Sequence, residues 1–169
     1  MIRTAALMIA VCAAGAHAQF TIDLSFNPSD RGSFVAVAFS ADTDEVFAYP
    51  EFGAAIDVYS RTGAFLRTVP RPGPSSNDID LDFASASVVI GGVTVPKGTL
   101  LVFNSENSSA ETVFAVNSAG VVIASTVLSV AGQGVGGTHD PVTGKFFVAD
   151  WASDVVRKME PNTGAEISS

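Results

Sequence analysis

Three aspartates spaced two residues apart are the first residues in the sequence whose pattern suggests chemistry. Asp78, Asp80 and Asp82 alternate with apolar residues in the run 77–83. Alternate side chains of an extended strand point to one face, so the three carboxylates share a face. Consecutive members would lie roughly 7 Å apart at their Cα atoms, so two of them, but not all three, can bind one calcium ion or another hard cation. The alternative is a metal-free strand surface that faces solvent or a channel.

A second group of chemically capable residues lies nearer the end of the chain. Asp150 and Trp151 follow an apolar run, and an exposed indole beside carboxylates suits a carbohydrate or peptide ligand. His139, a third candidate, is the only histidine after residue 18, so a site with several histidines is excluded. Two plainer alternatives are an indole buried between sheets and a turn in which the Asp140 carboxylate binds backbone amides. We predict no catalytic residue.

Three glycines match the letters of a dinucleotide-binding loop. Gly132, Gly134 and Gly137 have its spacing, but such a loop must lead into a helix whose N-terminus binds the phosphates. Here Asp140-Pro141 and another apolar run follow. The sequence therefore predicts a glycine-rich loop that precedes a strand.

The composition restricts the classes of partner. The chain has 169 residues, of which 47% are hydrophobic, so it can bury a core and fold as one modest domain. It carries 17 acidic against 9 basic residues, a net charge of −8. Binding of nucleic acid or of an anionic membrane surface requires a basic face, so neither partner is expected.

The first 18 residues have the features of an export signal. Arg3 precedes a short apolar stretch, and Ala16-His17-Ala18 is a small-x-small cleavage site. We expect the mature chain to begin at Gln19 and to be periplasmic or extracellular, in a bacterial host. No stretch reaches the roughly 18 consecutive apolar residues that span a membrane.

Short runs with the period of a β-strand recur along the rest of the chain, separated by turn-forming residues. No window shows the period of a helix, so the predicted fold class is all-β. The predicted strands are 20–26, 34–39, 46–49, 56–59, 79–83, 88–95, 99–103, 112–116, 121–128, 145–149 and 154–159.

An internal repeat sharpens this prediction. Residues 42–49 resemble residues 142–149, and Thr62-Gly63-Ala64 recurs as Thr163-Gly164-Ala165. With a looser middle copy, the chain divides into units of about 33–70, 78–128 and 133–169. Each unit has the strand order of a four-stranded antiparallel propeller blade. The alternative is a β-sandwich with similar hairpins.

The third unit carries a family resemblance. Residues 140–150, with Val155-Val156 and Asn162-Thr163-Gly164-Ala165, resemble blades of NHL-like and SMP-30-like (gluconolactonase-like, TolB-like) six-bladed β-propellers. The SMP-30-like resemblance implies a lactonase or esterase in which a divalent ion such as calcium polarises the lactone carbonyl. The matching residues are blade motifs, and no residue of this sequence matches that family's metal ligands.

Three blades are too few to close a propeller ring, which needs four to eight. We therefore expect a C-terminally truncated chain in which residues 20–26 would pair with a missing last blade. A complete chain would instead self-associate or form a sandwich. The predicted function is an exported binding module for an envelope, glycan or protein partner, and the alternative is a calcium-assisted lactonase or esterase.

Overall fold

The computed structural model describes residues 33–74, 78–105, 110–129 and 134–167, and every regular element in these ranges is a β-strand. The expected export signal and the predicted strand 20–26 lie outside the described residues. Within the described ranges there is no helix of the length and apolar character needed to cross a bilayer.

Eleven of the thirteen strands form three antiparallel sheets in chain order, which we call blades 1, 2 and 3, and the other two form a separate hairpin. Blade 1 consists of β1 (Phe34–Ser40), β2 (Glu45–Pro50), β3 (Ala55–Ser60) and β4 (Phe65–Pro70). Blade 2 consists of β5 (Asp78–Phe83), β8 (Leu100–Ser105), β9 (Thr112–Val116) and β10 (Val122–Val127). Blade 3 consists of β11 (Gly134–Asp140), β12 (Lys145–Asp150) and β13 (Val155–Met159). The fourth strand predicted for blade 3 is reduced to one bridge between Met159 and Glu166.

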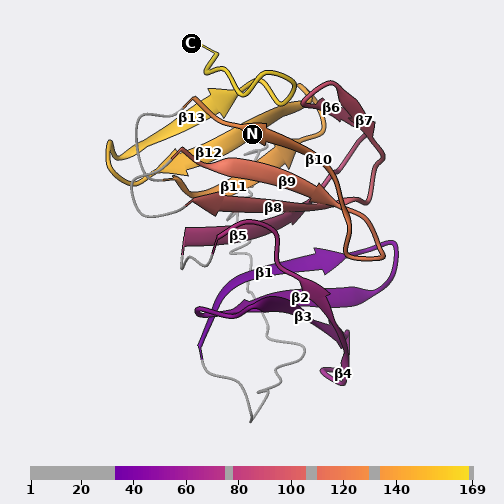
Figure 1. Cartoon of the computed structure of the whole chain (residues 1–169). Helices are drawn as coiled ribbons and strands as arrows, with labels where there is room; N and C mark the ends of the chain where they lie inside the picture. The colour runs from indigo at the N-terminus through magenta and orange to yellow at the C-terminus, as the bar shows by residue number, and fades with distance from the viewer. Residues whose placement is uncertain (1–32, 75–77, 106–109, 130–133, 168–169) are drawn as a thin grey trace, which may run out of the picture.

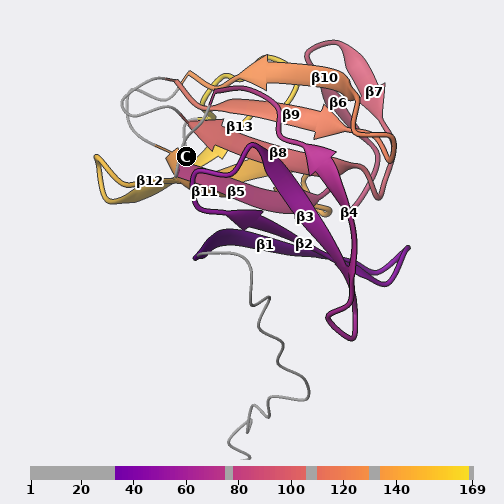
Figure 2. The same cartoon turned by 60° about the horizontal axis from the view of Figure 1, so that its bottom comes forward.

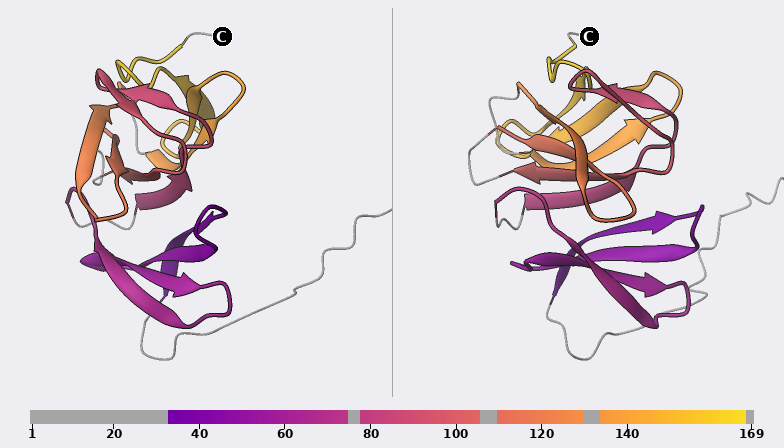
Figure 3. Two further views of the ribbon diagram at one scale, coloured as in Figure 1. Left: turned by 90° about the vertical axis from the view of Figure 1, so that its right-hand side faces the viewer. Right: turned by 45° about the vertical axis from the view of Figure 1, so that its right-hand side comes forward.

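The blades stand next to one another as an arc. The first strands of the blades, β1, β5 and β11, lie side by side (Figure 1), and blade 2 is between the other two (Figure 2). The left view of Figure 3 shows the three sheets fanning around one side of the molecule. The chain is therefore all-β, with the blades of an incomplete propeller, and the sandwich alternative is wrong.

Blades 1 and 3 repeat with an offset of 100 residues in the structure as in the sequence. Strand β1 starts at Phe34 and β11 at Gly134, and both strands have a register shift after their first residue. The following turns also agree, because Asp44 (φ 56°) and Gly144 (φ 66°) both adopt a left-handed backbone. The repeat recognised in the sequence is thus a repeat of backbone conformation.

Two apolar layers hold the arc together, one in each space between neighbouring blades. Ile56 and Val58 of blade 1 pack with Leu81 and Val102 of blade 2 in the first layer. In the second layer, Leu101 and Phe103 of blade 2 pack with Phe146 and Val148 of blade 3. Blade 2 contributes to both layers because the buried side chains of its strand β8 alternate between the two faces.

One predicted strand is wrong. Residues 88–95 form a hairpin of β6 (Val88–Ile90) and β7 (Val93–Val95) instead of one strand. Gly91 (φ 55°) and Gly92 (φ 85°) make the turn, a backbone shape that few other residues adopt. The hairpin is an insertion in the connection from β5 to β8.

Candidate functional site

Each blade has two ends, and the predicted site residues are divided between them. The β2–β3 and β12–β13 connections lie at one end, which we call the Trp151 end. The β1–β2 and β11–β12 turns and the β6–β7 hairpin lie at the other, which we call the Asp140 end. His139 pairs with Phe146, whereas Asp150 pairs with Gly134. The structure therefore brings Asp150 and Trp151 together but places His139 near the opposite end of the blade.

The aspartates of β5 bind the neighbouring blade. The carboxylate of Asp80 accepts hydrogen bonds from the Gly137 N–H (3.0 Å) and the Leu81 N–H (2.9 Å). That of Asp82 accepts from the His139 N–H and the Thr138 hydroxyl, both at 2.8 Å. The two carboxylates thus satisfy N–H groups on the edge of β11 that β12 does not pair.

The calcium prediction for Asp78, Asp80 and Asp82 stays a prediction. All three side chains are half-buried along β5. In the part of the chain that the structure describes, no three or more His, Cys, Asp or Glu side chains are grouped to hold a metal ion. The pKa of the Asp80 carboxyl group lies above its ordinary value. Burial is the largest cause of this increase, and the hydrogen bonds from Gly137 and Leu81 oppose it only in part.

His139 is a buried histidine with a defined hydrogen-bonding role. Its side chain is 3% exposed, and its Nδ1 accepts a hydrogen bond from the Ser85 N–H (3.1 Å). An accepting Nδ1 places the ring proton on Nε2, which is buried and has no partner. Burial lowers the pKa of His139, so the ring is neutral at pH 7. The next residue, Asp140, accepts from the N–H groups of Val142 and Thr143, which confirms the predicted turn.

Asp150 is also committed to a structural contact. Its side chain is fully buried and accepts a hydrogen bond from Arg157 Nε (2.9 Å). Burial raises the pKa of Asp150, but the hydrogen bonds from Arg157 and Ser153 outweigh it, and the net shift is downward. The carboxylate is therefore ionised and paired, and it fixes the start of the β12–β13 loop through the Ala152 N–H (3.1 Å).

Among the predicted site residues, Trp151 is the one whose side chain is largely exposed to solvent. Its side chain is 66% exposed, so the alternative of an indole buried between blades is wrong for this structure. It borders an open hollow of about 350 Å³ that Ala149, Asp154 and Val156 also line. Asp154 is exposed and has a left-handed backbone (φ 54°), so its carboxylate stands on a tight loop beside the indole. An aromatic plate, apolar walls and a carboxylate thus converge at the Trp151 end of blade 3.

Two of the three glycines of the predicted loop lie in a strand, contrary to the prediction, and the third, Gly132, lies outside the described residues. Gly134 and Gly137 lie within β11, where a side chain would collide with blade 2. A Cβ on Gly137 would lie 2.2 Å from the Phe103 ring, and one on Gly134 would lie 1.5 Å from an oxygen of Glu111. The close approach of blade 2 to this inner strand accounts for the glycines at positions 134 and 137.

Glu111 is an unusual residue that the sequence analysis missed. Its side chain is 1% exposed, and its Oε2 atom has no hydrogen-bond partner. Burial, together with the negative charges of Asp80 and Asp150, raises its pKa to about 8. Nothing in the local sequence indicates this, because the burial comes from packing against Gly134 of the next blade.

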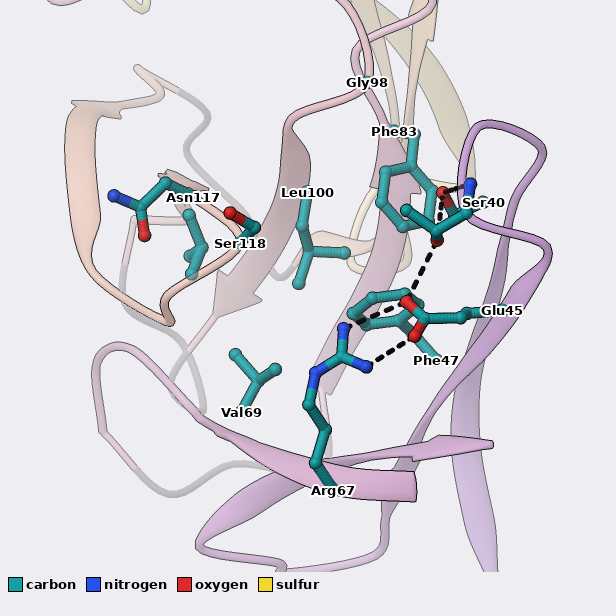
Figure 4. A pocket seen from close by; sticks show the side chains of 12 residues that line it. Ser40, Glu45, Phe47, Arg67, Val69, Phe83, Gly98, Leu100, Asn117 and Ser118 are labelled. Atoms are coloured by element: carbon teal, nitrogen blue, oxygen red, sulfur yellow. Dashed lines mark hydrogen bonds and ion pairs between the residues drawn. The ribbon is translucent and has the colours of Figure 1, made fainter. Parts of the chain in front are cut away.

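A small cavity between blades 1 and 2 was also not predicted (Figure 4). Arg67 donates to both carboxylate oxygens of Glu45, and Thr43 donates to the same carboxylate. The hydrogen bond and charge of Arg67 lower the pKa of Glu45. Phe47, Phe83 and other apolar side chains line the rest. The cavity volume of about 70 Å³ is well below the roughly 300 to 1,000 Å³ of ligand pockets, and its charges satisfy each other.

Comparisons with known proteins agree with this fold. No family model matches the chain, and no curated protein sequence matches it. A protein of unknown function from Bacteroides caccae superposes with a TM-score of 0.53 at 17% identity, over 80% of this chain and 44% of that one. A candidate 6-phosphogluconolactonase from Bacteroides fragilis gives 0.52 at 13% identity, over 78% and 37%. Hydrazine synthase from Kuenenia stuttgartiensis gives 0.51 at 18% identity, over 88% and 38%.

The chain thus spans about two fifths of the length of these structures. At such low identities the similarity concerns the fold alone. The 6-phosphogluconolactonase and the hydrazine synthase are β-propeller-type folds, and the three sheets described here are blades of that type.

Proposed function

We propose that this protein is a propeller-type binding module that takes a carbohydrate at the Trp151 end of blade 3. The observation that carries the proposal is the exposed indole of Trp151 beside the exposed Asp154 and the apolar Val156. An indole stacks on the apolar face of a sugar ring, and a carboxylate accepts hydrogen bonds from its hydroxyl groups. Residues 1–18 are predicted to be an export signal, and export to the envelope would bring the module to glycans.

The test uses isothermal titration calorimetry with soluble oligosaccharides of glucose, mannose and N-acetylglucosamine. We expect binding by the wild-type chain, at least a tenfold loss with Trp151→Ala, and partial retention with Trp151→Phe, which keeps an aromatic plate. Val142→Ala is the matched control, because Val142 is an exposed apolar residue at the Asp140 end. Equal affinity of wild type and Trp151→Ala would overturn the site.

Trp151 also provides a direct signal, because it is the only tryptophan of the chain. Stacking of a sugar on the indole should change its fluorescence at the ligand concentrations that produce heat. Heat without a fluorescence change would mean that the ligand binds elsewhere.

The second candidate is the calcium-assisted lactonase or esterase that the SMP-30-like resemblance implies. Its proposed ligands are Asp78, Asp80 and Asp82. Asp80 and Asp82 already accept hydrogen bonds from backbone N–H groups, so an ion would have to use their remaining lone pairs. Hydrolysis of simple lactones that stops with a chelator and returns with calcium would support this function. No turnover with or without calcium would exclude it for this chain.

A further inference from the structure

The β2–β3 connection of blade 1 presents a second exposed aromatic ring at the Trp151 end. It has the same number of residues as the β12–β13 connection of blade 3, and both connections are on the left in Figure 1. The side chain of Phe52 is 68% exposed, which matches the 66% of Trp151. Each connection also has an exposed acidic residue, Glu51 in blade 1 and Asp154 in blade 3. We call the two connections the Phe52 loop and the Trp151 loop.

The backbone of the Phe52 loop is fixed in an unfavourable conformation. Phe52 has a left-handed backbone (φ 56°), which bulky residues rarely adopt. The Gly53 carbonyl accepts hydrogen bonds from the Tyr49 hydroxyl (2.8 Å) and from Arg71 Nε (3.1 Å). The Gly53 N–H in turn donates to the Pro50 carbonyl (2.8 Å). Backbone strain of this kind concentrates at functional sites, so a ring held in solvent on a fixed loop indicates a contact with a ligand.

The form of the two loops favours a polysaccharide over a protein as that ligand. A protein partner usually needs a continuous surface of about 800 Å², whereas each loop offers one ring and one carboxylate. A polysaccharide repeats the same apolar ring faces and hydroxyl groups along its length, so it can bind two separate loops of the same chemistry. The carboxylates of Glu51 and Asp154, in a chain of net charge −8, favour a neutral polysaccharide over an acidic one.

We propose that the Phe52 loop is a second carbohydrate subsite, and that one neutral polysaccharide binds the Trp151 and Phe52 loops together. This proposal rests on the carbohydrate binding proposed for Trp151. A phenyl ring offers less stacking area than an indole, so the Phe52 subsite is the weaker of the two. Once a polymer has bound one loop, the second contact is intramolecular, and the overall affinity rises by roughly 10² to 10⁴.

The length of the ligand separates the two subsites. Blade 2 lies between blades 1 and 3 (Figure 2), so the two loops are about two sheet spacings apart, roughly 20 Å. A disaccharide is too short to span that distance and reports the stronger Trp151 loop. A polymer can contact both loops.

The test compares disaccharides with insoluble polymers of glucose, mannose and N-acetylglucosamine. Isothermal titration calorimetry gives the affinity for cellobiose, mannobiose and chitobiose, and depletion of the protein from solution gives the affinity for cellulose, insoluble mannan and chitin. Phe52→Gly removes the ring and suits the left-handed backbone. We expect this variant to change disaccharide affinity less than twofold and to weaken polymer binding at least tenfold. Phe52→Tyr, which keeps an aromatic plate, should retain the polymer affinity.

Phe65→Ala is the matched control. Phe65 is also an exposed phenylalanine of blade 1 (53%), but it begins β4 and therefore lies at the Asp140 end. This variant should leave both affinities unchanged. The melting temperature of Phe52→Gly, followed by circular dichroism, should be no lower than that of the wild type, because the lost ring is mostly in solvent and glycine relieves the backbone. A clear fall in melting temperature would overturn the proposal, since Phe52 would then be a structural residue.

Equal polymer affinity of the wild type and Phe52→Gly would overturn the second subsite and leave the Trp151 site intact. Equal losses of disaccharide and polymer affinity would also overturn it, because the ring would then support the Trp151 loop instead of contacting a separate part of the polymer. A wild type that binds neither the disaccharides nor the polymers would overturn both this proposal and the proposed function.

Discussion

The buried carboxyl group of Glu111 has a strongly raised pKa. It is buried at the seam of blades 2 and 3, and its pKa rises from the ordinary 4.5 to about 8. The unfolded chain loses this proton near pH 4.5, whereas the folded chain keeps it up to about pH 8. Its contribution to the free energy of unfolding is therefore complete below pH 4.5 and falls as the pH rises through that window.

Glu111→Gln should remove this dependence on pH. Between pH 5 and pH 8 the wild type should lose up to about 1.4 kcal/mol of unfolding free energy per pH unit relative to the variant. The measurement is urea denaturation at pH 5, 6, 7 and 8. Glu51→Gln, at an exposed position in the β2–β3 connection, is the control and should run parallel to the wild type. Parallel curves for wild type and Glu111→Gln would show that Glu111 ionises in the folded state as it does in the unfolded one.

At the scale of the residue, the sequence predicts little of the site, because the burial of a side chain depends on residues that are distant in sequence. Asp140 was predicted as a turn residue, since its partners Val142 and Thr143 are close in sequence. Asp150 and His139 were predicted as ligand-binding residues, but both are buried and hydrogen-bonded, to Arg157 and Ser85 respectively. Only the exposed Trp151 retains the predicted property, and that exposure depends on the loop geometry.

At the scale of the element, β11 shows how packing overrides propensity. Glycine weakens a strand, and the glycines of residues 134–137 led to the prediction of a loop. The strand exists because Phe103 fills the space that a side chain at Gly137 would take, and because Asp80 and Asp82 bind its edge N–H groups. Most of the other strands were predicted from their apolar pattern, but β4 (Phe65–Pro70) was missed, and β6 and β7 were predicted as a single strand.

Gly137→Ala should therefore destabilise the fold by about 1 to 3 kcal/mol, the usual cost of overpacking. Gly136→Ala is the matched control on the same strand, because its Cβ would meet only an Asp80 oxygen at 3.3 Å. Thermal unfolding followed by circular dichroism gives the comparison. A Gly137→Ala variant as stable as Gly136→Ala would mean that Phe103 moves away at no cost.

At the scale of the whole molecule, blades 2 and 3 are joined by polar groups as well as by their apolar layer. Asp82→Ala leaves the His139 N–H and the Thr138 hydroxyl without their acceptor, which should cost about 1 to 3 kcal/mol. Urea denaturation of Asp82→Ala, Thr138→Val and the double variant forms a cycle, and a loss smaller than additive is expected. If Asp82 instead binds calcium, the loss should appear only when calcium is present.

The propeller architecture was predictable because a repeat copies the same strand order along the chain. The arrangement of the blades was not, since it depends on contacts such as Phe103 with Phe146, at 5.3 Å between ring centres. Such a contact joins residues far apart in sequence, and each residue alone is only another apolar residue. The periodicity of the sequence identifies each blade, whereas the contacts between blades are known only from the three-dimensional structure.

The order of pairing within the blades also has a consequence for how the chain folds during synthesis. Every strand of blade 1 pairs with a strand next to it in sequence, so this sheet can form as soon as residue 70 is free of the ribosome. Contacts between near neighbours close quickly. In blade 2, β5 pairs with β8 and must wait for the hairpin insertion between them. Blade 1 should therefore become protected from hydrogen exchange first, and the seam with blade 3 last.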